Sequence, residues 1–364
     1  MNSPTMITTP DSPPAPEGDV KTRRHARLRI KLRDLSQTLG IFAAVIVFGV
    51  CFTAFNPTFG HLTNFGNIAS QSSILGIMAT GMTFAIVAGE IDLSVGSAFA
   101  LTAMIFALLL QGGMNVYLAA VCAIAAGAGL GLINGVLSVV LNVPTIIITL
   151  GTLNVYAGAA LWLSNGLPVS HFSTTGPLFS FSQNNFSGSS LVSWIPEIAV
   201  AWVVVCALGY LLLTKTAFGL RIYATGSSRR AATYAGISGG RTRIQALAIV
   251  GVSAGLAGVL SVGQYGSASP GAGSSYNLTV IAAVIIGGAA LNGGRGSVIA
   301  SAFGVLLLGE VNNGLIIAGV NLYGQIVAQG ALVVLAVALD QVLHGTSWYH
   351  AIAQRRWRAL SRRT

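Results

Sequence analysis

Residues 116–141 read VYLAAVCAIAAGAGLGLINGVLSVVL and contain no charged side chain. The hydrocarbon core of a bilayer is about 30 Å thick, and roughly 20 apolar residues in a helix cross it. Within the stretch, Gly127, Gly131 and Gly135 recur at four-residue spacing, and Gly255 with Gly258 extends this theme later in the chain. Small residues at such spacing let helices approach closely inside a membrane. The stretch therefore predicts a tightly packed membrane helix.

Comparable stretches lie on both sides of residues 116–141. Of the 364 residues, 53% are hydrophobic and only 8% are charged, whereas about one quarter is charged in an average soluble protein. This composition predicts an all-α, polytopic membrane helical bundle, and it excludes a cytoplasmic enzyme or a secreted disulfide scaffold. About ten spans are expected, at residues 37–55, 68–89, 93–111, 116–141, 144–163, 194–213, 244–264, 277–291, 297–318 and 322–343.

The basic residues lie in three short segments. All of the 19 lysines and arginines except Arg295 fall within residues 21–33, 215–243 and 355–363. A net charge of +10 can indicate nucleic-acid binding, but basic clusters beside apolar spans indicate cytoplasmic loops by the positive-inside rule. We therefore expect a bilayer and no nucleic acid as partner. Alternating crossings bring all three segments to one side, so both termini are expected to be cytoplasmic.

The spans divide the chain into three regions. Residues 1–36, rich in proline and then in basic residues, predict a disordered, basic cytoplasmic leader. Residues 37–343 form the transmembrane domain, and residues 344–364 form a basic cytoplasmic tail. The spans at 68–89, with polar residues near its start, and at 277–291, short and glycine-rich, are each candidates for a broken or partial helix. Such helices are tolerated only where protein or a water-filled cavity covers the backbone.

Polar side chains at membrane depth are mostly neutral. A path lined by hydroxyls and amides suits a neutral, hydroxyl-rich solute, although a hydrogen bond between helices is the commoner role for any single residue. Glu310 is the exception, because a charge at mid-span costs about 2.5 kcal/mol or more. It either lines the path or is a neutral acid bonded to a neighbour. The candidates for the translocation path are Thr149, Thr152, Asn154, Glu310, Asn312 and Asn313.

Several motifs of enzyme and metal chemistry are missing. No lysine follows a glycine, so the sequence has no G-K-[ST] phosphate loop, and it has neither H-E-x-x-H nor C-x-x-C. We expect no catalytic residue, cofactor or metal site, and hence no enzyme. The pattern predicts transport or binding, with any energy supplied by a partner.

Residues 82–97, MTFAIVAGEIDLSVGS, resemble the signature of membrane permeases of ribose-type monosaccharide ABC importers. Further matches follow in the family's order, and the resemblance covers about residues 40–340. The further matches are VPT at 143–145, TLG at 149–151, NG at 165–166, FG at 218–219, ATG at 224–226, AA at 231–232, GI at 236–237 and LNGGRGS at 291–297. The order in which these matches occur together is more specific than any single match.

The resemblance implies a multi-pass subunit of the bacterial plasma (inner) membrane that forms the translocation path for a neutral sugar, a pentose or similar monosaccharide. It also implies a homodimer of this chain, two ATP-binding subunits that hydrolyse ATP, and a periplasmic or lipid-anchored sugar-binding protein. The same superfamily leaves a nucleoside, a branched-chain amino acid or a furanose-like signalling molecule as alternative solutes. An ion-coupled secondary transporter would need an ion site near the midplane, where only Glu310 is available.

Residues 214–243 would carry the coupling helix that sits in a groove of the ATPase, according to the resemblance. Residues 228–237 can form a short helix, with Ser227 or Ser228 as N-cap and Gly236 as its end. The alternative is a basic loop attracted to anionic lipid. The coupling candidates are Gly219, Gly226, Arg229, Arg230, Tyr234, Gly236 and Ile237.

The signature itself contributes residues with structural roles. Asp92 and Ser94 stand just before an apolar span, where we expect either to cap the helix rather than to contact sugar. Gly89 and Gly96 would permit a tight reversal of the chain. A similar glycine pattern recurs near Arg295. The signature and structural candidates are Gly89, Asp92, Ser94, Gly96, Asn292, Gly294 and Gly296.

Overall fold

The computed structural model describes residues 20–186 and 192–344, and every regular element in these ranges is a helix. Over these residues, seven helices are long and apolar enough to cross a bilayer, and shorter apolar helices lie among them. The prediction of an all-α membrane bundle is confirmed. The long helices are α1 (Val20–Phe55), α2 (Leu62–Val87), α4 (Val116–Val140), α5 (Thr145–Leu163), α7 (Glu197–Lys215), α10 (Gly239–Tyr265) and α12 (Val298–Ile317). The shorter ones are α3 (Val95–Gln111) and α11 (Tyr276–Ile286), and α13 (Leu322–His344) contributes the shorter apolar stretch Leu322–Leu335.

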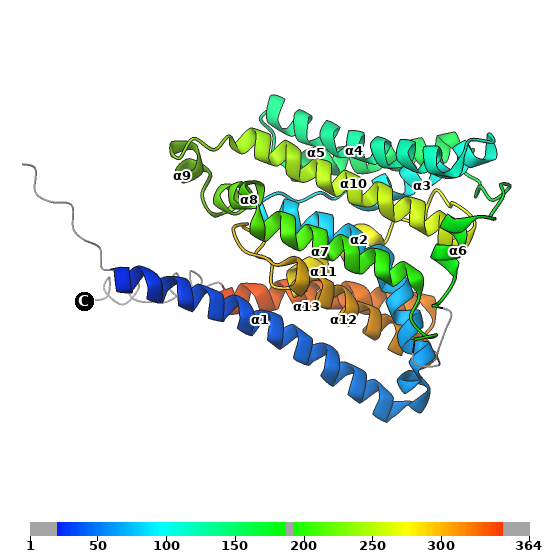
Figure 1. Cartoon of the computed structure of the whole chain (residues 1–364), viewed down its shortest axis with the longest axis horizontal. Coiled ribbons are helices and arrows are strands. Elements are labelled where there is room, and N and C mark those ends of the chain that lie inside the picture. Colours follow the sequence, from blue (N-terminus) through cyan, green and yellow to red (C-terminus); the bar gives the residue numbers. More distant parts are fainter. Residues whose placement is uncertain (1–19, 187–191, 345–364) are drawn as a thin grey trace, which may run out of the picture.

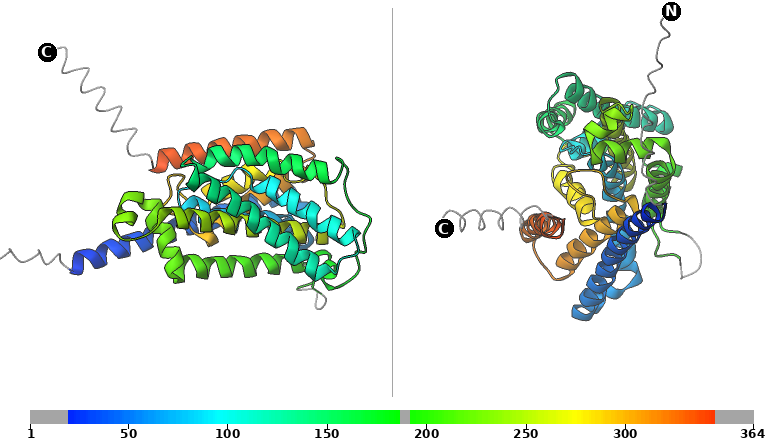
Figure 2. Two further views of the ribbon diagram at one scale, coloured as in Figure 1. Left: turned by 90° about the horizontal axis from the view of Figure 1, so that it is seen from above. Right: turned by 90° about the vertical axis from the view of Figure 1, so that its left-hand side faces the viewer.

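Small helices mark the two ends of the bundle (Figure 1). The helices α8 (Ala217–Ser227) and α9 (Arg229–Tyr234) lie at one end, where α1 also begins. The helix α6 (Pro177–Gln183) lies at the other end, and the 3-10 helix η1 (Pro57–Gly60) joins α1 to α2. We call these the α9 end and the α6 end. Figure 2 shows the long helices side by side between the two ends.

The helix α2 is central and unbroken, so the idea that span 68–89 is a broken helix is wrong. It packs against α7, α10, α11 and α12, and most of its apolar stretch is buried. Polar residues near its start do not interrupt the helix, and a serine hydroxyl can bond to the backbone of its own helix. Ser73, for example, donates its hydroxyl to the Ala69 carbonyl at 2.6 Å.

The span at 277–291 is a partial helix, as its glycines suggested. The helix α11 ends at Ile286, and Gly288 then takes a positive φ of 84°. The chain continues without regular structure to residue 297. This segment is covered by protein: Gly294 donates its backbone N–H to the Val87 carbonyl at 2.8 Å. Buried protein contacts of this kind satisfy backbone groups that a lipid environment would leave unpaired.

The helix α1 begins at Val20, earlier than predicted. Residues 20–36, expected to be disordered, are helical, because the basic segment continues the helix of the apolar span. The proline-rich residues of the predicted leader and the tail from residue 345 lie outside the described residues.

The predicted glycine stripe lies where α4 crosses α10. A Cβ added at Gly135 would lie 2.7 Å from the Ile244 Cα, and one added at Gly255 would lie 2.9 Å from the Ile124 Cα. Gly258 faces α3, where an added Cβ would lie 2.8 Å from Thr102 Oγ1. Real side chains do not fit at these distances, so the glycines set how closely the three helices approach.

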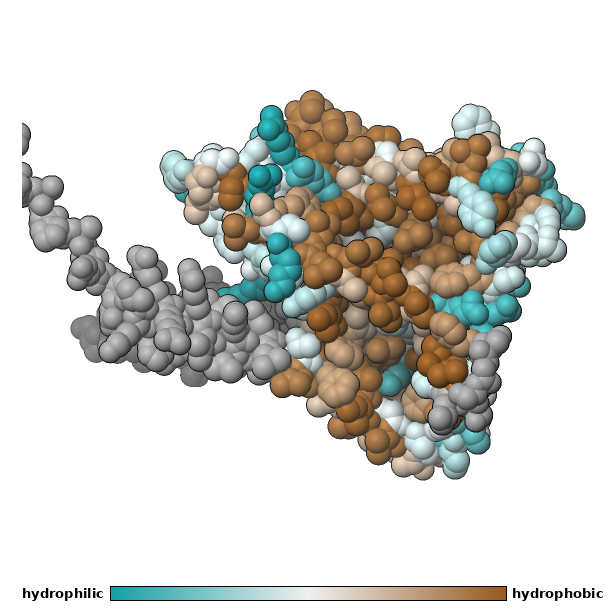
Figure 3. Space-filling view, viewed as in Figure 1, coloured by the Kyte–Doolittle hydropathy of each residue, from teal (hydrophilic) through white to brown (hydrophobic). Residues whose placement is uncertain are grey.

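The outer surface matches a bilayer environment. Figure 3 shows apolar residues over the middle of the visible face and hydrophilic residues toward the α9 and α6 ends. Val121, Val155 and Val203 are among the exposed large apolar residues. A soluble protein rarely exposes so continuous an apolar surface.

Candidate functional site

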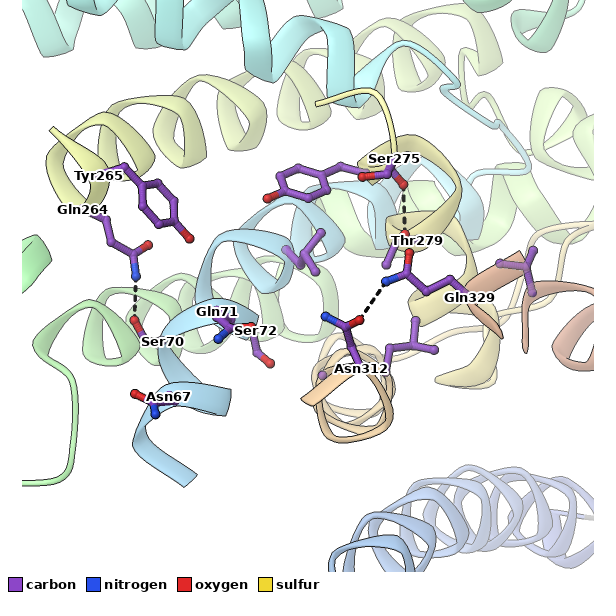
Figure 4. A pocket seen from close by; sticks show the side chains of 15 residues that line it. Asn67, Ser70, Gln71, Ser72, Gln264, Tyr265, Ser275, Thr279, Asn312 and Gln329 are labelled. Atoms are coloured by element: carbon purple, nitrogen blue, oxygen red, sulfur yellow. Dashed lines mark hydrogen bonds between the residues drawn. The ribbon is translucent and has the colours of Figure 1, made fainter. Parts of the chain in front are cut away.

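A polar cavity opens between five helices in the half of the bundle nearer the α6 end (Figure 4). Its volume is about 380 Å³. The cavity lies where the start of α2, the end of α10 and the start of α11 face the middle of α12 and α13. The lining residues are Asn67, Ser70, Gln71, Ser72, Leu75, Gln264, Tyr265, Ser275, Tyr276, Thr279, Leu308, Gly309, Asn312, Gln329 and Val333.

The cavity wall is neutral and rich in hydrogen-bonding groups. Gln264 donates to the Ser70 hydroxyl at 2.6 Å, and Gln329 donates to Asn312 Oδ1 at 3.2 Å (Figure 4). Gln264 Oε1 and Ser72 Oγ are buried and have no hydrogen-bond partner among the described residues. Buried polar atoms are nearly always satisfied, so the unused hydrogen-bonding capacity of these two atoms is an exception among the buried groups beside the cavity.

Of the predicted path residues, the structure brings only Asn312 to the cavity wall. Asn313, its neighbour on α12, instead accepts a hydrogen bond from Asn64 Nδ2 at 2.9 Å. Glu310 is also buried and faces α1 at Gly49, and its Oε2 has no partner among the described residues.

The predicted path residues of α5 lie away from the cavity. Thr149 and Thr152 are buried, whereas Asn154 is exposed and donates to the Leu150 carbonyl of its own helix at 3.3 Å. Our sequence reasoning missed most lining residues because they lie near the ends of spans. One signal was available, since Asn67, Ser70 and Gln71 share one face of α2 at helical spacing.

Three glycine-rich turns meet at the α9 end. Gly89 takes a positive φ of 80°, as the predicted reversal requires. A Cβ added at Gly293 would lie 2.7 Å from the Gly89 Cα and 3.0 Å from the Gly226 Cα. The signature loop, residues 88–94 between α2 and α3, therefore touches the end of α8 and the segment after α11 through glycines. The Asn292 carbonyl faces Gly89 as well.

The other glycines named from the sequence are also places of close approach. Gly294 and Gly296 take positive φ angles of 76° and 152°, and an added Cβ at Gly294 would lie 2.8 Å from the Ser227 Cα. Gly96 does not form part of the reversal. It lies in the first turn of α3, where the Gly273 backbone leaves no room for a side chain.

The prediction that Asp92 or Ser94 caps α3 is wrong. Ser94 occupies the N-cap position, but neither side chain makes a capping bond into α3. The Asn277 side chain on α11 accepts the Gly96 backbone N–H at 2.5 Å instead. This amide is distant in sequence, so it takes the place of the local cap.

Asp92 belongs to a buried network with α4 and α5. It accepts bonds from the Ser94 backbone N–H at 2.8 Å and from the Ser94 hydroxyl at 2.6 Å. Asn134 donates to the Ser94 hydroxyl at 2.8 Å and to Asp92 at 3.3 Å, and it accepts from the Tyr156 hydroxyl at 3.0 Å. The network fixes the signature loop against two membrane helices.

Glu90 is the functional candidate that the sequence analysis did not single out. Its Oε1 pairs with Arg229 Nη2 at 2.5 Å and with Arg243 Nε at 2.8 Å. The hydroxyl of Thr145 donates to Oε2. Arg243 also donates to the hydroxyl and carbonyl of Ser138, at 2.9 and 3.2 Å. These partners are far apart in the sequence, so no local pattern could have revealed the cluster, which lines an open cavity of about 260 Å³.

The short helix predicted in the basic loop is α9. Ser228 caps it by accepting the Ala231 backbone N–H at 3.3 Å, and Gly236 follows with a positive φ of 77°. A side chain in the left-handed region is disfavoured, so glycine suits this end of the helix. Ser228 and Gly236 are thus the predicted cap and end, although the helix covers residues 229–234 and not the whole of 228–237. The helix α8 before it was not predicted.

The coupling candidates differ in their surroundings. Arg230 and Tyr234 are exposed on α9, with Tyr234 at 92%, and Ile237 is half-buried beside them. Gly219 and Gly226 are instead packed against the backbone of Leu213 and Val87. Arg229 differs from these residues because it reaches back to Glu90.

The sequence matches a family described as branched-chain amino acid transport system / permease component, over residues 64–337. Among curated relatives, the ribose import permease protein of Bacillus subtilis is 36% identical over 313 residues, which cover 86% of this chain and 95% of the relative. The D-allose transport system permease protein of Escherichia coli is 36% identical, over 84% of this chain and 91% of the relative. The galactose/methyl galactoside import permease protein of Haemophilus influenzae is 34% identical, over 85% and 95%.

No solved structure gives a significant match to this chain. The resemblance to ribose-type permeases that was drawn from the signature is confirmed by these relatives.

Proposed function

Since this chain belongs to the branched-chain amino acid transport system / permease component family, we propose that it is the membrane-spanning subunit of an ATP-driven importer of a neutral monosaccharide. Its relatives are named for ribose, allose and galactose, and they are similar over most of the chain. The chain itself is not an enzyme in this proposal. ATP is hydrolysed by a partner subunit.

The neutral, amide-lined cavity is the observation that carries the sugar assignment. Sugars present many hydroxyls and no charge, so they are recognised by neutral donors and acceptors together with apolar or aromatic surface. The cavity offers the Gln264 and Gln329 amides, and Tyr265 and Tyr276 line it as well. It has no Lys, Arg, Asp or Glu among its lining residues. A zwitterionic amino acid would leave its charges without partners there.

The partners follow from the family. Two copies of the chain would form the permease, two ATP-binding subunits would bind at the α9 end, and an extracytoplasmic sugar-binding protein would dock at the α6 end. The basic loop at 215–243 supports a cytoplasmic α9 end by the positive-inside rule. The exposed side chains of α9, Arg230 and Tyr234, would then face the ATPase.

Alternating access gives the mechanism. ATP binding would draw the ATPase subunits together, displace α9 and open the path toward the binding protein, and hydrolysis would reverse the change. A ligand shifts such an equilibrium only by its differential affinity for the two states. The permease should therefore bind sugar weakly, and the binding protein should set most of the specificity.

Uptake into proteoliposomes tests this function. The chain would be reconstituted with its ATPase and binding protein, and labelled ribose, allose and galactose would be supplied with ATP. The variant Asn312→Leu should reduce uptake by about tenfold, because it removes a polar partner from the cavity wall and leaves the Gln329 amide unpaired, a loss of about 1–3 kcal/mol. Gln111→Leu, at an exposed amide at the end of α3, is the matched control and should leave uptake unchanged.

The same assay separates the alternatives. A nucleoside or a branched-chain amino acid carried in place of the sugars would overturn the sugar assignment while keeping the importer. Uptake driven by an ion gradient without ATP would overturn the importer itself. Equal uptake by Asn312→Leu and Gln111→Leu would show that the cavity is not part of the path.

A further inference from the structure

The carboxylate of Glu90 is shared by two arginines that differ in burial. Both guanidinium groups bind the same oxygen, Oε1. The Glu90 side chain is 4% exposed and that of Arg243 is 13% exposed, whereas that of Arg229 is 55% exposed. One arginine is therefore held inside the protein, and the other reaches in from the surface.

This difference determines which ion pair can open. A buried carboxylate that loses its only cation is strongly disfavoured. If Arg229 moved away, however, Glu90 would keep Arg243, and Thr145 would still donate to Oε2. Water can solvate the released Arg229 guanidinium, and ion pairs with an exposed partner are weak. Arg229 can therefore leave and return at little cost, whereas Arg243 cannot.

The permanent part of the cluster is connected to the membrane helices. Glu90 follows α2, and its backbone N–H bonds to the Ala85 carbonyl at 2.9 Å. Arg243 belongs to α10 and binds Ser138 on α4, and the Ser138 and Thr145 hydroxyls lie 3.2 Å apart. The releasable partner, Arg229, is the first residue of α9. The cluster thus joins one short surface helix to four membrane helices.

We propose that the Glu90–Arg229 ion pair is a releasable link through which α9 acts on the membrane helices, and that both are positioning residues for energy coupling. The inference rests on the proposed function, in which α9 contacts the ATPase. When the ATPase displaces α9, the pair opens and Arg243 keeps Glu90 neutralised. When α9 returns, the ion pair forms again and holds α9 in its original position against the ends of α2 and α5.

The ratio of sugar uptake to ATP hydrolysis tests the link in the complete transporter. Arg229→Gln leaves the buried Glu90–Arg243 pair intact, so the protein should fold and assemble with its ATPase. ATP hydrolysis should continue, while uptake per ATP should fall by a factor within the range of about 5 to 150 found for coupling between sites. Arg229→Lys keeps the charge and should give an intermediate ratio.

A second variant and a matched control complete the design. Glu90→Gln should lower the ratio too, and adding Arg229→Gln to it should cause no further loss, because the link is already broken. Arg241→Gln removes the same charge from an exposed position of α10, and its ratio should equal that of the unaltered protein.

The outcomes separate this inference from the proposed function. If the unaltered complex shows no ATP-dependent sugar uptake, the proposed function fails. If it transports sugar and Arg229→Gln matches Arg241→Gln, the link is overturned. If Arg229→Gln no longer co-purifies with the ATPase, Arg229 is a direct contact to that subunit, and the link is overturned as well.

Discussion

At the scale of single residues, Asn134 holds the signature loop in place. It is 1% exposed, and its one amide serves Asp92, Ser94 and Tyr156. Buried polar groups cost free energy when they lose a partner, and several groups here depend on one side chain. Asn134, which lies outside the signature, therefore helps to hold the signature loop in its conformation.

Replacing Asn134 by leucine should destabilise the protein. The change removes the hydrogen bonds that Asp92, Ser94 and Tyr156 make to this amide, each worth about 1 kcal/mol. Each partner keeps at least one further bond. The melting temperature of the purified protein in detergent is the measurement. Asn154→Leu is the control, because that exposed amide bonds only within its own helix, as far as the structure describes it. Equal melting temperatures for the two variants would contradict the role given to Asn134.

At the scale of elements, the contact between α4 and α10 depends on glycine at particular turns. Gly131 faces the Leu247 carbonyl on α10, and there is no room for a Cβ between them. Gly129 lies on the same helix, but an added Cβ there would meet nothing within 4 Å. The two glycines look alike in the sequence and differ only in what they face.

Gly131→Ala should therefore destabilise the bundle, whereas Gly129→Ala should not. Overpacking of a close contact costs about 1–3 kcal/mol, while alanine in an open helical position gains up to about 1 kcal/mol over glycine. Melting temperatures of the two variants, measured side by side, test this. A loss of stability in Gly129→Ala as large as that in Gly131→Ala would show that helix propensity, and not the crossing, governs the effect.

At the scale of the whole molecule, the two ends of the bundle differ in charge. The basic loop with α8 and α9 lies at one end, and the uncharged segment around α6 lies at the other. In the proposed orientation, the positive-inside rule would place the α9 end in the cytoplasm.

Cysteine labelling tests this orientation. In a variant with Cys51, Cys122 and Cys206 replaced by alanine, Ser170→Cys and Arg221→Cys would each supply one exposed thiol. A membrane-impermeant maleimide should label the Ser170→Cys protein in intact spheroplasts. It should label the Arg221→Cys protein only after permeabilisation, which also serves as the control for reactivity. The opposite order would reverse the proposed orientation.

The sequence by itself determined the spans and the short helix α9. A hydrophobic stretch long enough to cross a bilayer is a local property, and so are the Ser228 cap and the Gly236 end of α9. For the same reason, the family signature could be identified without coordinates. Even the partial helix at 277–291 was indicated by its own glycines.

Only the tertiary structure decided which residues meet. The cavity takes its wall from five helices, so single residues gave no sign that Gln264 and Gln329 share it while Asn154 does not. The Glu90 cluster joins Thr145, Arg229 and Arg243 from three separate segments. Hydropathy and capping act over one or a few helical turns, whereas these contacts arise when distant helices pack, which no local pattern specifies.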